Sequence, residues 1–83
     1  MTLKIGKLYQ AKETMHFFTV RPAGRHILVS KGCILMFLKA KPTRADFRPG
    51  TVKLYFLCGE HRFRTSFVED VDKWVEEHVV LVL

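Results

Sequence analysis

The stretch ILVSKGCILMFL, residues 27–38, holds two apolar runs on either side of Ser30-Lys31-Gly32. The second run, Cys33 to Leu38, has six residues, which is too short to span a membrane and suits a buried strand. Gly32 can adopt a positive φ at no steric cost, so a tight turn between the runs is favoured. The stretch therefore predicts two strands joined by a tight turn.

Further strands are expected on both sides of this stretch. Residues 4–12 read as a short first strand, and residues 15–21 read as a second strand or a structured loop. The strand that begins at Cys33 should end at Pro42, because proline has no N–H to donate within a sheet. A polar loop over residues 42–50 follows.

A β-hairpin is predicted over residues 51–67, together with its register. Both of its runs alternate, and Gly59-Glu60 between them suits a two-residue type II′ turn. The expected partners are Cys58 with His61, Leu57 with Arg62, Phe56 with Phe63, Tyr55 with Arg64, Leu54 with Thr65, Lys53 with Ser66 and Val52 with Phe67. This register gives one largely apolar face, and a slip by one residue would mix the two faces.

A short C-terminal α-helix is expected over about residues 67–78. Ser66 and Glu69 form the S-x-x-E pattern of a capping box, and acidic residues follow where the helix dipole favours them. The apolar positions at helical spacing are Phe67, Val71, Trp74, Val75 and His78. The last five residues, VVLVL, fit either a closing strand or a helical extension that packs on a partner.

Length and composition indicate one intracellular domain over residues 1–83. A hydrophobic fraction of 48% argues against disorder, and two cysteines are too few for a disulfide scaffold. The N-terminus shows no apolar core of a signal peptide, and VVLVL is too short to cross a bilayer. We therefore expect a cytoplasmic protein that makes no membrane contact.

Charge is distributed unevenly along the chain. Residues 1–66 hold thirteen Lys or Arg against three acids, a net of +10, whereas residues 67–83 hold one Lys against five acids, a net of −4. A basic body favours a polyanionic or acidic partner, and a charged surface that only keeps the protein soluble is the alternative.

Five to six short antiparallel strands and one helix predict a mainly β protein built as a small barrel. The segment LVSKG (28–32) followed by ILMF (34–37) resembles the diverging turn of SH3-like barrels, where a Lys-Gly turn precedes a strongly apolar strand. The segment LYQA (8–11) is similar to the first SH3 strand. The resemblance covers residues 6–67 and implies a small SH3-like barrel.

The chain departs from the peptide-binding SH3 domains. It has neither the tryptophan at the start of the next strand nor the acidic loop between the first strands, so proline-rich peptide binding is not implied. Its basic charge is closer to the KOW, Tudor and other nucleic-acid-associated barrels, and small proteins of this kind also occur among bacteriophage accessory proteins. Because a fold alone does not define a function, the candidate residues decide between these classes.

The outer face of the predicted hairpin is the first candidate site. Basic residues around an aromatic ring suit nucleic acid, because cations neutralise phosphate and a ring can stack on a base. Lys39 and Lys41 join this face if their strand is the neighbour and keeps the same phase, and the 42–50 loop adds further cations. The full predicted set is Lys39, Lys41, Arg44, Arg48, Lys53, Tyr55, Arg62 and Arg64. We expect mostly phosphate contacts to DNA or RNA; the alternative is a solvated face with a Tyr55–Arg64 cross-strand pair.

A second function class is a small protein–protein interaction module, such as a viral factor that binds and modulates a host protein. Phe47 and Leu57 would then supply apolar contacts, and charge would steer the approach. An exposed VVLVL strand would also offer an edge through which two copies could form a homodimer.

An enzymatic role is the third class, and the sequence argues against it. Cys58 and His61 would be cross-strand neighbours, and such a pair can form a thiolate nucleophile. No orienting third group is evident, so a core cysteine beside a histidine is the simpler interpretation. The cysteines and histidines also lack metal-ligand spacing such as C-x-x-C. We expect a non-enzymatic protein with no metal and no cofactor.

Overall fold

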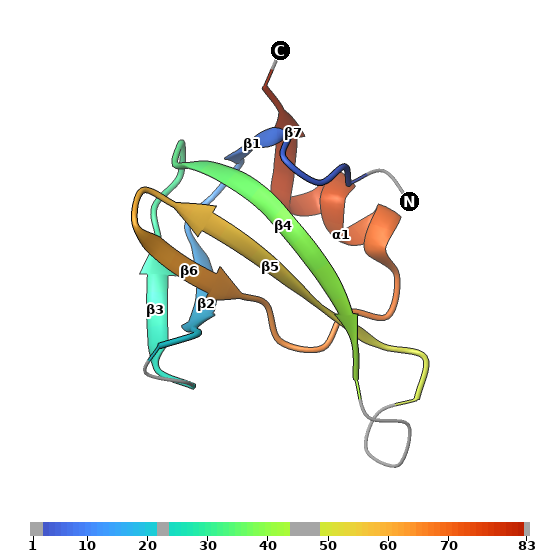
Figure 1. Cartoon of the computed structure of the whole chain (residues 1–83). Coiled ribbons are helices and arrows are strands. Elements are labelled where there is room, and N and C mark those ends of the chain that lie inside the picture. The colour runs from blue at the N-terminus through green and yellow to red at the C-terminus, as the bar shows by residue number, and fades with distance from the viewer. Residues whose placement is uncertain (1–2, 22–23, 44–48, 83) are drawn as a thin grey trace.

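The computed structural model describes residues 3–21, 24–43 and 49–82. Its elements are β1 (Leu8–Ala11), β2 (Met15–Thr19), β3 (His26–Val29), β4 (Ile34–Pro42), β5 (Val52–Cys58), β6 (His61–Arg64), α1 (Val71–His78) and β7 (Val79–Leu81). The strands form one antiparallel sheet in the order β3-β2-β6-β5-β4-β1-β7, which curls into a half-barrel (Figure 1). The mainly β class with one short C-terminal helix is confirmed, but the described chain has seven strands rather than five to six. Across these ranges, the one helix is too short and too polar to cross a membrane.

The concave face of the sheet carries the core. Leu35, Phe37, Leu54 and Phe56 have no exposed surface, and Phe17 is almost as deeply buried. The Phe56 ring lies 5.6 Å from that of Phe37 and 5.9 Å from that of Phe17, measured between centroids. Aromatic rings at these separations add attraction beyond the surface that they bury, so this cluster is the centre of the fold.

The turn expected around Gly32 is present. Gly32 has φ +90°, and its N–H donates to the Ala11 carbonyl at 2.9 Å, which ties the turn to the end of β1. The two strands that the turn joins do not pair with each other, because β3 pairs with β2 whereas β4 pairs with β1 and β5. The two strands therefore diverge at the turn: β3 lies in one half of the sheet and β4 lies in the other.

The predicted hairpin register is confirmed over most of its length. The four pairs nearest the turn, from Cys58–His61 to Tyr55–Arg64, are present. The register changes farther on, because Val52 pairs with Val68 and not with Phe67. Near this change the Thr65 hydroxyl accepts from the Leu54 N–H at 2.9 Å and donates to the Ser66 carbonyl at 2.8 Å. The Thr65 hydroxyl thus accepts a hydrogen bond from a backbone N–H, which in a regular β-ladder would donate to a backbone carbonyl.

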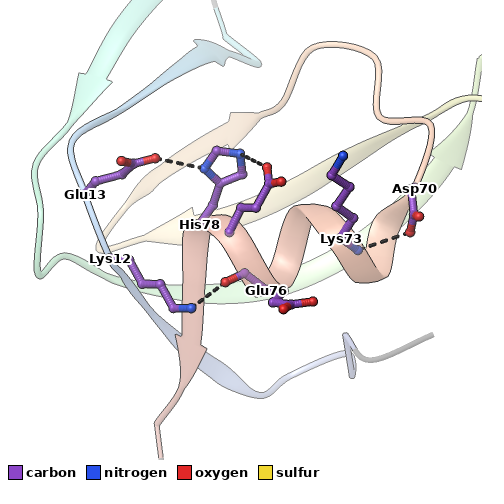
Figure 2. Close-up of polar contacts among 7 residues, drawn as sticks. Lys12, Glu13, Asp70, Lys73, Glu76 and His78 are labelled. Atoms are coloured by element: carbon purple, nitrogen blue, oxygen red, sulfur yellow. Dashed lines mark hydrogen bonds and ion pairs between the residues drawn. The ribbon is translucent and has the colours of Figure 1, made fainter.

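The helix begins four residues later than the sequence predicted. Asp70 is its N-cap, and the Asp70 carboxylate accepts from the Lys73 N–H at 3.1 Å (Figure 2). Ser66 does not cap the helix, because Val68 exchanges two backbone hydrogen bonds with Val52 at 3.0 and 2.9 Å. Those bonds keep the preceding segment extended, so the first helical turn can form only after it.

Helix α1 packs on the concave side of the sheet. Val71, Trp74, Val75 and His78 are all partly buried, as their spacing predicted, and the Trp74 ring stacks on Phe56 at 5.7 Å. Figure 2 shows the end of the helix tied to the segment after β1, where the Lys12 ammonium donates to the Glu76 carbonyl and Glu13 contacts His78. The acidic helix therefore packs against its own chain. The residues that follow it form the closing strand β7, not a helical extension.

Candidate functional site

A β-bulge in β4 places two lysines on the convex face of the sheet. Phe37 pairs with Phe56 and Lys39 pairs with Tyr55, so Leu38 is an extra residue without a counterpart on β5. In a regular strand, Lys39 would share the face of the buried Phe37. The strand therefore does not keep one phase; the bulge shifts it by one residue, and this shift brings Lys39 and Lys41 onto the outer face.

One line of cross-strand neighbours runs over that convex face. Each member is the direct partner of the next: Lys39 on β4, Tyr55 on β5, Arg64 on β6, Phe18 on β2 and His26 on β3. We call these five residues the cation–aromatic row. Neighbouring strands lie about 4.8 Å apart, so the row extends over roughly 19 Å of the sheet.

Ring contacts hold the cations of the row in position. The Lys39 Nζ lies 5.1 Å from the Tyr55 ring centroid, and the Arg64 guanidinium carbon lies 4.9 Å from that of Phe18. The Phe18 ring meets the His26 ring edge-on at 4.7 Å. Each exposed cation–π contact contributes about 0.5–1 kcal/mol, so the charges are oriented before any ligand arrives.

Three more of the predicted cations flank the row on the same face. Lys41 and Lys53 are direct cross-strand partners, and the Lys53 Nζ lies 5.5 Å from the Phe67 ring centroid. Arg62 is exposed opposite Leu57, beside a cavity of about 380 Å³ that Arg21 also lines. Among the described residues, no carboxylate lies within ion-pair distance of these side chains or of the cations in the row. The face therefore presents five cations whose charge is available to a ligand.

Not every predicted site residue belongs to this arrangement. Arg44, Phe47 and Arg48 lie outside the described residues. Leu57 is half-buried and faces outward beside Met36, its partner on β4.

Sequence analysis missed Phe18, His26 and His16. The rings of His16 and His26 lie 5.3 Å apart, at the His26 end of the row. The adjacent pair Phe17-Phe18 indicated that one ring must face outward. The pairing of β2 with β6, which places Phe18 beside Arg64, joins residues far apart in the chain and leaves no local signal.

Five of the eight acidic residues lie toward the opposite side of the molecule. Glu69, Asp70, Asp72, Glu76 and Glu77 are all exposed on α1 or just before it. Because α1 packs against the concave face, the convex face is basic and the helix side is acidic. Such a charge separation attracts a polyanion to one face and repels it from the other.

The Cys58–His61 pair lies beside the turn of the β5–β6 hairpin. The two residues are cross-strand partners, as predicted, and the His61 ring lies parallel to the Phe63 ring with 6.1 Å between centroids. Both cysteines are free thiols. Across the described ranges, no group of three or more His, Cys, Asp or Glu side chains is placed to hold a metal ion.

Comparisons of the chain with protein-family models, with curated proteins and with solved structures found no match. The functional argument therefore depends on the geometry of the convex face.

Proposed function

We propose that the protein is a non-enzymatic nucleic-acid-binding module that uses the convex face of its sheet. The observation that carries this proposal is the cation–aromatic row, in which Lys39 and Arg64 are held over aromatic rings. A surface that only maintains solubility does not need its cations oriented. Fixed cations on one face suit a ligand with regularly spaced negative charges, which is the character of a phosphodiester backbone.

We also propose that the domain belongs to the SH3-like barrels. Two features support this assignment. The strands on either side of the Gly32 turn diverge, and the strand that follows the short helix pairs with the first strand of the chain. The hairpin β2–β3 would then be an elaboration between the first strand and the diverging turn.

The mode of binding follows from the composition of the face. Five cations act through phosphate contacts, which position the ligand without reading its sequence. Tyr55 and Phe18 lie between them, and each has a cation over its ring. A base could stack on these rings only by displacing the cation, so phosphate contacts should dominate over stacking. A single strand with accessible phosphates suits such a shallow, curved sheet.

The test is a fluorescence-anisotropy titration of labelled single-stranded DNA, duplex DNA and RNA at 50 and 200 mM salt. We expect binding of roughly micromolar affinity or tighter at low salt, weakening steeply at high salt. The variant Arg62→Glu/Arg64→Glu places two negative charges on the convex face and should abolish binding.

A matched control makes the same change in net charge elsewhere. Lys4→Glu/Lys31→Glu alters two exposed lysines outside the row and its flanking cations, and it should retain most of the affinity. Circular dichroism must show that both variants are folded. Unchanged affinity in Arg62→Glu/Arg64→Glu, or no binding by the wild-type chain at low salt, would refute the proposed function.

A further inference from the structure

The last strand of the sheet exposes a backbone edge. Among the described residues, β7 is the end of the strand order and pairs with β1 alone. The Val82 N–H donates to the Leu8 carbonyl at 2.9 Å, and the Lys12 N–H donates to the His78 carbonyl at 2.9 Å. Inter-strand bonds of an antiparallel strand alternate in direction along the chain. The N–H and C=O of Leu81 therefore point away from β1, toward the outer edge.

The two edges of the sheet differ in their protection. At the other edge, Arg25 directly precedes β3 and Lys31 lies two residues after it, and charged residues of this kind discourage pairing with another chain. Residues 79–82 contain no charged residue and no proline. The β3 edge therefore has charged residues both before and after it, whereas at β7 the nearby charged residues, Glu76 and Glu77, lie before the strand.

Exposed apolar side chains gather beside the unprotected edge. Within the described ranges the large hydrophobic residues that are exposed are Ile5, Leu8, Leu28, Ile34, Val80, Leu81 and Val82. Five of these seven residues lie on β1, on β4, on β7 or directly after β7. Leu8 lies opposite Val82, and Gln10 separates Ile34 from Val80 across the same three strands. Exposed apolar surface next to an open edge is typical of an interaction surface.

We propose that a second copy of this chain covers the edge, with the two β7 strands pairing antiparallel about a two-fold axis at Leu81. The N–H of Leu81 in each copy would donate to the Leu81 carbonyl of the other. An antiparallel edge is complementary to itself, so an identical chain satisfies it without any further recognition element. The side chains of Val80 and Val82 in the two copies would meet on the convex side.

The geometry of this pairing has a consequence for the convex face. A two-fold axis between antiparallel strands is perpendicular to the sheet, so both convex faces lie on the same side of the combined sheet. The dimer would present two cation–aromatic rows on one surface. This consequence rests on the proposed function, whereas the dimer itself does not.

The first test is the mass of the protein in the absence of nucleic acid. Sedimentation velocity over a range of concentrations should show a mass that rises from 9.7 kDa to twice that value and stops there. The variant Leu81→Pro removes an N–H that points away from β1. It leaves intact every N–H of β7 and Val82 that donates a hydrogen bond to β1. Because proline is tolerated at the outer edge of a sheet, this variant should stay folded and remain at 9.7 kDa.

The second test does not depend on a variant. Amide hydrogen exchange measured at low and high protein concentration should show protection of the Leu81 N–H that increases with concentration. The Val82 N–H, which donates within one chain, should be protected at both concentrations. A mass of 9.7 kDa at every concentration, assembly beyond two copies, or a folded Leu81→Pro variant that dimerises like the wild type would overturn the proposal.

Discussion

Removal of two exposed cations, Lys41 and Arg62, tests the convex face most directly. Lys41 and Arg62 are exposed, and neither side chain is held over a ring or donates to a neighbour among the described residues. The double variant Lys41→Gln/Arg62→Gln should therefore leave the fold intact and change only the charge on the face. The net charge falls from +6 to +4.

The magnitude of the effect follows from counterion release. For a single strand, the logarithm of the binding constant falls with the logarithm of the salt concentration by about 0.7 per phosphate neutralised. If all five cations of the convex face contact phosphates, the slope for the wild type is about −3.5 and that of the variant about −2.1. At 50 mM salt the two lost contacts reduce affinity about 70-fold, or roughly 2.5 kcal/mol.

The assay is anisotropy titration of a labelled oligothymidine at 50, 100 and 200 mM salt. Lys4→Gln/Lys31→Gln removes the same charge from two exposed positions outside the face and should keep a slope of about −3.5. Equal losses in the two variants would mean that net charge, and not this surface, drives binding. An unchanged slope in Lys41→Gln/Arg62→Gln would mean that these cations contact no phosphate. Either result would refute the assignment of the face.

Two further predictions concern the fold, and both use urea unfolding followed by Trp74 fluorescence. Asp70→Ala removes the observed N-cap and should cost about 1 kcal/mol, whereas Ser66→Ala should change stability by less than about 0.5 kcal/mol; a larger loss at Ser66 would place the cap where the sequence alone suggested. Thr65→Val leaves the buried Leu54 N–H without the hydroxyl that accepts from it and should cost about 1–3 kcal/mol, while Thr65→Ser should retain most of that stability. Equal stability of the Val and Ser variants would show that this hydrogen bond contributes nothing.

Local patterns were sufficient for the central part of the fold. The alternation on either side of Gly59-Glu60 predicted the β5–β6 register near the turn, because a two-residue turn joins adjacent residues and sets their pairing. Gly32 likewise predicted a turn with positive φ. In both cases the residues that determine the structure are close together in the chain, so a short segment of sequence is enough to predict it.

Non-local pairing was responsible for the errors. The capping box at Ser66 was a reasonable local signal, but Val52, which lies 16 residues before Val68, holds that segment extended. A bonded strand segment cannot also form the first turn of a helix, so the helix begins only after Asp70. The local preference was overridden by hydrogen bonds to a distant strand.

The candidate site shows the same division between features that local sequence predicts and features that depend on non-local pairing. The sequence by itself determined which residues are cationic and that Lys53, Tyr55, Arg62 and Arg64 share one face of a hairpin. Only the tertiary structure decided that a bulge at Leu38 turns Lys39 and Lys41 onto that face, and that β2 brings Phe18 beneath Arg64. The physical reason is that side-chain alternation is a property of one strand, whereas bulges and strand order depend on how the whole sheet closes around its core.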